Sequence, residues 1–456
     1  MVKKMFKRKI YNELIAWKNN SNGKSALLIE GARRIGKTTI AKEFGKKEYP
    51  AFYTIDFSIV SEKFKLIFDD LSNIDEFFSK LFLSLKIPHL PYGGLLIFDE
   101  IQFCPKARQA IKHLVADGRY HYIETGSLVS IIEHTSNILI PSEEEKIQMY
   151  PMDYEEFLWA INAIDEANLL KTYYKERKTF DGKFHQLFIK NFSLYLALGG
   201  MPKVIATFLD TNDFYEADKE KRKIINLYEE DLRKIDNKFG TICYMVWKQI
   251  PTMLSKHSTR FIVSSLNQRA DSILFQNTLN KLEESKIIIP VYKCTDPSGG
   301  FALTKDNNAF KLYFSDIGLF VSLIYLNSKN DTRDIYQKII LNKLDLNLGM
   351  LYENYAAQAL LANGFEPYYY SWNDELDGKI KNYEIDFLIN KTNKTIPLEI
   401  KSKKVSSLSS LNQFKKKFGK NIGEKFIVKL KPLTFGDNLT NLPSYMLFTI
   451  GDNQSR

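Results

Sequence analysis

The chain has 456 residues, which is too many for one hydrophobic core, so about two to four domains are expected. Apolar residues make up 44% of the chain and aromatic residues 13%, which excludes a disordered or fibrous protein. Three cysteines without metal-ligand spacing exclude a disulfide scaffold and a zinc ribbon. No apolar run approaches the roughly 18 residues of a membrane helix, and no apolar stretch follows the basic N-terminus, so we expect a cytoplasmic protein with no membrane partner.

The first motif lies between residues 26 and 39 and predicts a phosphate-binding loop. Residues 26–29 form a short apolar run typical of a buried strand, and GARRIGKT, from Gly31 to Thr38, matches G-x-x-x-x-G-K-[ST]. The glycines let successive N–H groups face one anion, Lys37 reaches the outer phosphates, and the Thr38 hydroxyl is expected to bind Mg²⁺. A helix from about Lys37 presents its positive end to the anion. The residues expected to contact ATP here are Gly31, Ala32, Arg33, Arg34, Ile35, Gly36, Lys37, Thr38 and Thr39.

About sixty residues further on, an apolar run at 95–98 ends in Asp99-Glu100. Such a run predicts a central parallel strand, and its end is the edge of the sheet at which ligands bind. We expect Asp99 to hold the Mg²⁺ shell and Glu100 to accept a proton from the attacking water. Two solvated acids at a strand end are the alternative, but the preceding loop favours the catalytic interpretation.

The segment YHYIETGS, residues 120–127, predicts the next strand. Thr125 and Ser127 would then lie at its tip, where a hydroxyl could contact the γ-phosphate or the water. A strand-ending turn built on Gly126 accounts for the segment equally well, so both interpretations stay open.

Three further segments carry a resemblance to a known group: PMDYEEFLWA at 151–160, LALGGMPKVI at 196–205 and FKLYFSDIGLF at 310–320. With them the chain resembles, nearly end to end, prokaryotic ATPases of the AAA superfamily that carry an uncharacterised, restriction-endonuclease-like C-terminal domain. GGMP and KLYFSDIGL are the specific parts of this likeness. Taken with the residue patterns, it predicts an α/β fold with four parts: a P-loop ATPase core (1–164), a helical lid (165–238), a winged helix-turn-helix (239–328) and a nuclease-like α/β domain (329–456).

No arginine is assigned as a finger acting on a neighbouring subunit, and homo-oligomer formation is left open. Many relatives carry a Gly-Arg pair between the TGS strand and the PMDYEEF-like segment, whereas IPSEEEKIQMY in this chain has no arginine. The arginines near the predicted site are Arg33 and Arg34 in the loop, and Arg108 and Arg119 beside the two strands.

The predicted winged helix begins with a helix that ends near Lys256 and a short helix at 262–265. A third helix at 272–285 has apolar residues at helical spacing, and two β runs enclose a Gly299-Gly300 loop like a wing. The third helix would present Gln276, Asn277, Asn280 and Lys281 to a DNA major groove. Since it also carries two glutamates, we favour protein packing or weak DNA contact over sequence-specific reading.

Near the C-terminus, NYEIDFLINKTNKTIPLEIKSKK predicts a β-hairpin with strands at 383–390 and 395–402. With Thr392-Asn393 as the tight turn, Asp386 lies directly opposite Glu399, their Cβ atoms about 5 Å apart. Two carboxylates that close repel unless a cation lies between them, and Mg²⁺ or Mn²⁺ prefers oxygen ligands.

Asp386, Glu399 and Lys401 together form the D-x(12)-E-x-K spacing typical of metal-dependent nucleases. Lys401 would orient a water or stabilise the phosphate, and the resemblance offers Glu353, on a helix predicted at 350–362, as a further metal ligand. A charged, exposed hairpin is the competing interpretation. A nuclease-like domain that only binds a partner is a third, so cleavage is left open.

Most of the net charge of +10 lies in one block, because residues 401–431 contain ten lysines and one acid. Such a block, from Lys401 to Lys431, favours a polyanion such as DNA, and a solvated lysine-rich surface is the alternative. The preferred hypothesis is a Mg²⁺-dependent ATPase that acts on DNA through its C-terminal domain, with a second Mg²⁺ or Mn²⁺ there if it cuts. The alternative is a nucleotide-dependent switch or scaffold that binds a partner without cleavage.

Overall fold

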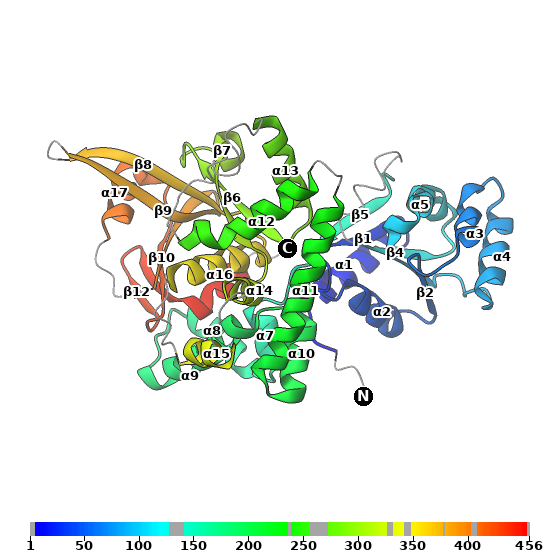
Figure 1. Cartoon of the computed structure of the whole chain (residues 1–456), viewed down its shortest axis with the longest axis horizontal. Coiled ribbons are helices and arrows are strands. Elements are labelled where there is room, and N and C mark those ends of the chain that lie inside the picture. The colour runs from blue at the N-terminus through cyan, green and yellow to red at the C-terminus, as the bar shows by residue number, and fades with distance from the viewer. Residues whose placement is uncertain are drawn as a thin grey trace. The chain divides into compact units, whose positions relative to one another are not determined.

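A computed structural model gives the fold (Figure 1). It describes residues 5–126, 141–235, 239–255, 272–325, 332–341, 348–376, 379–402 and 408–453. The chain forms two compact units: residues 1–150 together with 284–286, and residues 151–283 together with 287–456.

The first unit is built on a five-stranded sheet in the order β2-β3-β4-β1-β5, in which all neighbouring strands are parallel. Its strands are β1 (Ala26–Glu30), β2 (Phe52–Asp56), β3 (Leu95–Asp99), β4 (His121–Thr125) and β5 (Glu144–Gln148). The strand order reverses direction at β1, so the loop after β1 lies at a switch point, where open parallel sheets bind ligands. The predicted strands at 26–29 and 95–98 and the parallel sheet are confirmed.

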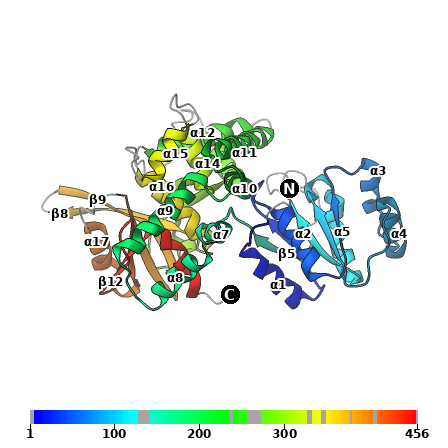
Figure 2. The ribbon, with the colours of Figure 1, turned by 90° about the horizontal axis from the view of Figure 1, so that it is seen from below.

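Helices cover this sheet on both faces (Figure 2). They are α1 (Ile10–Ser21), α2 (Lys37–Glu48), α3 (Glu62–Lys65), α4 (Ile74–Leu85) and α5 (Pro105–Asp117), with short 3₁₀ turns at Leu66–Asp69 and Ile101–Phe103. Side chains alternate along β3, so Leu96 and Phe98 pack against α4 and α5 in one buried core. The other face of the sheet contacts α2, which begins at Lys37 as predicted.

The second unit opens with helices. They are α7 (Tyr154–Ala160), α8 (Ile164–Lys175), α9 (Gly182–Leu198), α10 (Pro202–Thr211), α11 (Phe214–Lys234), α12 (Gly240–Ser255) and α13 (Ser272–Glu284). In the described part of the chain no single helix is both long and apolar enough to cross a membrane, and α9 and α10 meet that criterion only as a pair bent by 116°.

Its eight-stranded sheet has the order β12-β13-β11-β10-β9-β8-β6-β7. The strands are β6 (Ile288–Cys294), β7 (Lys305–Phe314), β8 (Tyr368–Leu376), β9 (Lys379–Lys391), β10 (Lys394–Lys401), β11 (Lys425–Lys429), β12 (Thr434–Gly436) and β13 (Leu439–Pro443). The helices α14 (Ile317–Ile324), α15 (Thr332–Ile340), α16 (Leu348–Ala362) and α17 (Ser409–Phe418), a 3₁₀ turn at Phe301–Thr304 and 3₁₀ segments at Gly419–Asn421 and Ser444–Asn453 complete this unit.

The β6–β7 hairpin, predicted as the wing of a separate domain, belongs to this same sheet. Tyr292 and Lys293 of β6 pair in parallel with Tyr368 and Tyr369 of β8. The predicted boundary at 328/329 therefore falls between strands of one sheet. The third helix of the predicted winged helix is present as α13, whereas the short helix at 262–265 lies outside the described residues. The winged helix and the four-part division stay predictions.

The three segments that carry the resemblance meet inside the second unit. Gly200 donates its N–H to Asp316 Oδ2 at 2.6 Å, and the carbonyl of Gly200 accepts from Met152 N at 2.8 Å. Asp316 also caps α14 by accepting from Leu319 N at 2.9 Å. PMDY, GGMP and FSDIG are thus parts of one buried junction, and their role in this structure is to join α7, α9, α10 and α14.

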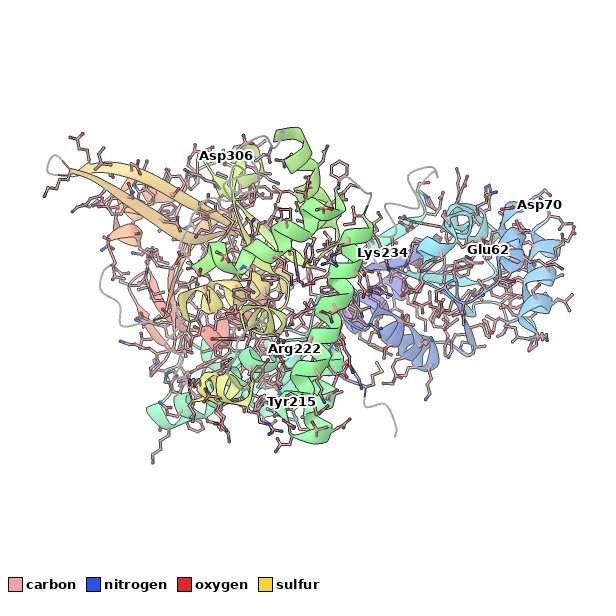
Figure 3. The ribbon with its side chains drawn as sticks, in the orientation of Figure 1. Glu62, Asp70, Tyr215, Arg222, Lys234 and Asp306 are labelled. Atoms are coloured by element: carbon pink, nitrogen blue, oxygen red, sulfur yellow. The ribbon has the colours of Figure 1, made fainter. Side chains whose placement is uncertain are left out.

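A buried polar network lies beside this junction. Lys221 is fully buried and donates to Ala197 O at 2.8 Å and to the Tyr336 hydroxyl at 2.6 Å. Asp218, one turn earlier on α11, accepts from Tyr336 at 2.6 Å and pairs with Arg222, labelled in Figure 3, also at 2.6 Å. Asp218 thus has a charged partner in Arg222, whereas Lys221 donates to two neutral oxygens, and burial lowers the pKa of Lys221 to about 8.

Candidate nucleotide site and carboxylate cluster

The phosphate loop joins β1 to α2 with backbone angles that favour glycine. Gly31 has φ +151° and Gly36 has φ +102°, and a Cβ at Gly31 would lie 2.3 Å from the Met149 carbonyl oxygen. Because a β-carbon cannot be accommodated there, the spacing of the two glycines is a structural requirement. The N-terminus of α2 follows at once, so its unpaired N–H groups and positive dipole end lie at the loop.

Lys37 is buried in this loop. Its Nζ donates to the carbonyl oxygens of Gly31 at 2.9 Å and Ala32 at 2.8 Å. Burial lowers the pKa of Lys37 to about 8, against the opposing effect of Glu100 and Asp99. The ammonium is thus held by loop carbonyls at the position from which it would reach a phosphate.

The end of β4 and the start of α2 meet at Asp99, the last residue of β3. Its Oδ1 accepts from the Thr38 hydroxyl at 2.7 Å and from the Thr125 hydroxyl at the tip of β4. Asp99 is 5% exposed and Thr125 is 1% exposed, so this cluster is largely shielded from water. The Thr125 hydroxyl is thus bound to Asp99, the two interpretations of the ETGS segment both stay predictions, and Ser127 lies outside the described residues.

Glu100 takes a left-handed conformation with φ +53°, which turns the chain away from β3 directly after Asp99. Its Oε2 accepts from the Gln102 side-chain amide. Asp99 and Glu100 therefore differ in environment: Asp99 is tied to the phosphate loop, and Glu100 is partly exposed and oriented by Gln102.

Two of the four arginines near the site are bound within their own unit. Arg108 is 2% exposed and holds Glu144 with two hydrogen bonds of 2.8 and 2.7 Å. Arg119 pairs with Asp75 at 2.7 Å and with Asp117 at 2.9 Å. In the loop, Arg33 is half-buried, and Arg34 is exposed and has φ +70°.

In the second unit, the hairpin has the predicted register. The β9–β10 ladder pairs Lys391 with Lys394 and Phe387 with Leu398, around a turn in which Thr392 and Asn393 both have positive φ. Positive φ angles at both turn residues are typical of the type I′ turn, whose twist matches that of the two strands of a hairpin. Beyond the ladder, Asp386 Oδ2 accepts from the Ile400 N–H at 2.7 Å, and Lys401 Nζ lies 2.7 Å from Glu399 Oε1.

A second lysine enters this carboxylate cluster from β7. Lys311 Nζ lies 2.6 Å from Glu384 Oε1 and 3.9 Å from Glu353 Oε2. The Tyr313 hydroxyl donates to Glu353 Oε2 at 3.1 Å. Burial and then the Asp386 charge raise the pKa of Glu399 to about 7, and burial likewise raises the pKa of Glu353.

Comparison with known proteins bears on the first unit. Residues 23–158 match the family described as AAA domain. Most of this match lies in the first unit, and residues 23–158 are called the AAA domain after the description of that family. Residues 189–330 and 348–445 match two families described only as domains of unknown function, DUF8612 and DUF4143. The chain matches none of the curated proteins with which it was compared.

Solved structures show weak likeness to the chain. A Walker-type ATPase of Pyrococcus abyssi is 16% identical, with 70% of this chain and 96% of that one covered and a TM-score of 0.41. Cdc6p from Pyrobaculum aerophilum is 13% identical, with 75% and 97% covered and a TM-score of 0.27. A signal-transduction ATPase with a tetratricopeptide repeat sensor from Pyrococcus horikoshii is 13% identical, with 79% and 50% covered and a TM-score of 0.25. These scores carry no argument, so the assignment rests on the AAA match and on the loop.

The donor chemistry of the AAA domain fits Mg²⁺. Thr38 and Asp99 supply a hydroxyl and a carboxylate, which are hard oxygen ligands, and their side chains are already in contact. The C-terminal cluster does not fit a metal in the same way. Among the described residues, no group of three or more His, Cys, Asp or Glu side chains is placed to hold a metal ion, and a lysine ammonium lies against Glu384 and another against Glu399.

Several residues of these sites were missed by sequence reasoning. Arg8 donates to the carbonyl oxygens of Ile35 in the loop, at 2.9 Å, and of Tyr150, at 2.6 Å. Arg8 belongs to no sequence motif that would have indicated this role. Gln102 and Glu384 had a local signal, since each lies two residues from a predicted acid. Lys311 and Tyr313 stand in the KLYF segment that carried the resemblance, but nothing local linked that segment to the hairpin.

Proposed function

We propose that the AAA domain binds ATP with Mg²⁺ and hydrolyses it. The observation that carries this proposal is the contact of 2.7 Å between the Thr38 hydroxyl and Asp99 Oδ1, because it joins the phosphate loop to the acidic strand across 61 residues of sequence. Phosphate chemistry of this kind requires an anion cradle and metal-binding oxygens at one place.

The residues have separate roles in this proposal. Thr38 and Asp99 would hold Mg²⁺, which when bound screens the phosphate charge. Lys37 exchanges its loop carbonyls for the outer phosphate oxygens, and the N–H groups of the loop hold the rest of the triphosphate. Glu100, oriented by Gln102, accepts the proton of the attacking water.

We further propose a cytoplasmic protein that acts on DNA through its second unit. The exposed lysines Lys415, Lys416 and Lys417 on α17 support this. So does a cavity of about 530 Å³ between α13 and the β6–β7 hairpin, because four of its lining residues carry amides, which hydrogen-bond to base edges. Its lining residues are Gln276, Asn280, Asn307 and Asn308 together with Glu283, Tyr292 and Lys305. The free, buried state of all three cysteines agrees with a reducing compartment. Assembly into homo-oligomers stays part of the hypothesis.

Metal-dependent DNA cleavage is a second candidate, and one observation favours it. Around the β9–β10 hairpin, Asp386 accepts from the Ile400 N–H and Lys401 pairs with Glu399, which supports an arrangement of the D-x(12)-E-x-K residues close to one another. Nicking of supercoiled plasmid with Mg²⁺ or Mn²⁺ tests it, with Asp386→Ala and Lys401→Ala as comparisons. Equal nicking by all three proteins, or none, would remove the nuclease candidate.

Phosphate release from ATP tests the hydrolysis. We expect Glu100→Gln to lose at least about 10²-fold in rate, as removal of a general base does, while it still binds ATP. Lys37→Ala should lose ATP binding itself. Glu76→Gln makes the same chemical change on the surface helix α4 and should behave as wild type. A Glu100→Gln protein as fast as wild type would refute the assigned base.

A further inference from the structure

Lys311 is the residue of the carboxylate cluster that neither the motif nor the proposed function uses. It lies on β7, in the hairpin that joins the C-terminal sheet through β8. The Tyr313 ring, two residues further along β7, packs 5.8 Å from the Phe387 ring of β9, which brings this strand to the predicted nuclease-like residues. Lys311 is 8% exposed, so its ammonium has left bulk water.

The ammonium of Lys311 lies between Glu384 and Glu353, of which Glu353 is the acid that the nuclease resemblance offers to a metal. Its distances are 2.6 Å to Glu384 Oε1 and 3.9 Å to Glu353 Oε2. A buried lysine is stable only when it is paired, and here the surrounding acids keep it charged. A divalent cation at this place would meet a positive charge at contact distance, which opposes its binding.

The remaining acids of the cluster also have partners from the chain. Lys401 Nζ holds Glu399 Oε1 at 2.7 Å, and Asp386 Oδ2 accepts the Ile400 N–H at 2.7 Å. Within the described residues, the buried oxygens of the cluster left without a hydrogen-bond partner are Glu384 Oε2 and Glu399 Oε2. These two oxygens can accept hydrogen bonds from water, so the charges and hydrogen bonds of the cluster can be satisfied without a metal.

We propose that the Lys311 ammonium is the resident cation of this cluster and stands in place of a divalent metal, so that the second unit binds its partner without cutting it. The statement that the second unit binds its partner without cutting it rests on the proposed function, action on DNA. The statement that the cluster holds no divalent metal rests only on the residues of the cluster. Lys311 thus links β7 to α16 and β9 by charge.

Binding of Mn²⁺, followed by electron paramagnetic resonance in the absence of nucleotide, tests the proposal. The full chain is used with Thr38→Ala, which removes the metal ligand of the phosphate loop. We expect this protein to bind no Mn²⁺ at micromolar concentration. Adding Lys311→Met to this protein keeps much of the side chain but removes its charge. The double variant should bind one Mn²⁺ per chain, with a dissociation constant at least about tenfold lower than that of the Thr38→Ala protein. A further Glu384→Gln should remove it.

Two results would overturn the proposal. One is a Mn²⁺ ion bound by the Thr38→Ala protein and lost on Glu384→Gln or Glu399→Gln, since the cluster would then hold a metal beside Lys311. The other is a folded Lys311→Met protein that gains no Mn²⁺. If Lys311→Met does not fold, the titration of the Thr38→Ala protein with and without Glu384→Gln still decides. Failure of DNA binding would refute the proposed partner and leave the Mn²⁺ result unaffected.

Discussion

Glu166 on α8 shows how burial sets the charge of a single carboxyl group. Its oxygens accept from the Tyr154 hydroxyl at 3.2 Å and from the Asn191 amide at 2.6 Å. Burial raises the pKa of Glu166 from 4.5 to about 7, and the two hydrogen bonds oppose this rise only in part. Between these two values the folded chain binds more protons at this site than the unfolded chain does, so stability falls as the pH rises through this window.

We therefore expect Glu166→Gln to be more stable than wild type above pH 7, by roughly 1 kcal/mol after allowance for solvent screening. The difference should shrink towards pH 5, where wild type is protonated as well. Thermal midpoints of both proteins over this pH range measure it. Asp165→Asn, a change of similar kind at the exposed neighbouring position, should leave the pH profile as it is. An equal pH profile in wild type and Glu166→Gln would show that Glu166 is ionised throughout.

At the site itself, the residues predicted from sequence are those fixed by local geometry. Gly31, Lys37 and Thr38 belong to one short loop, and Asp99 ends a strand whose apolar run was plain. Because parallel strands end at one edge, their convergence followed from the strand assignment alone. Arg8 and Lys311 could not be predicted in this way, since each reaches its partners across a distance in sequence that no periodicity encodes.

At the scale of elements, two helix junctions cross at glycines. Gly199 ends α9 with φ +77°, and Gly318 lies in the first turn of α14. A Cβ at Gly318 would lie 2.2 Å from the Leu198 carbonyl oxygen, so the two backbones must separate to admit it. GGMP and SDIG are thus paired parts of one crossing, which explains their pattern without a catalytic role.

Gly318→Ala should accordingly destabilise the second unit by about 3 kcal/mol or more. Urea unfolding followed by tryptophan fluorescence measures this, because three of the four tryptophans, Trp159, Trp247 and Trp372, belong to the second unit. Gly182→Ala is the matched control: nothing lies within 4 Å of its added Cβ, and it begins α9. The control should be stabilised by up to about 1 kcal/mol. Equal midpoints for both variants would contradict the close crossing.

The elements also show where prediction from sequence ends. The β9–β10 hairpin was predicted with its register because the two-residue turn and the alternation are local signals. The sequence did not predict that the β6–β7 hairpin joins the C-terminal sheet. This junction depends on only two residue pairs, Tyr292 with Tyr368 and Lys293 with Tyr369. A contact that small, 76 residues apart in sequence, leaves no pattern to read.

At the scale of the whole molecule, the lysines of the basic block, residues 401–431, differ in how exposed they are. Lys425 is buried, Lys401 is paired with Glu399, and Lys403 and Lys404 lie outside the described residues. Lys415, Lys416 and Lys417 are exposed together on α17. Lys431 is also exposed but lies outside α17. Among the described lysines of the block, exposed positive charge is therefore densest on this one helix.

If DNA contacts this helix, replacing Lys415, Lys416 and Lys417 by glutamine should weaken binding and reduce its salt dependence. Each lost phosphate contact lowers the slope of log K against log salt by about 0.9, so the triple variant should lose up to about 3 from the slope. Fluorescence anisotropy of a labelled duplex over a salt series measures both quantities. The same change at Lys63, Lys112 and Lys183, exposed lysines elsewhere, alters the net charge equally and should leave the slope near that of wild type. Equal slopes for the two triple variants would mean that the net charge, and not α17, attracts DNA. A slope near zero in wild type would indicate that the partner is a protein and not DNA.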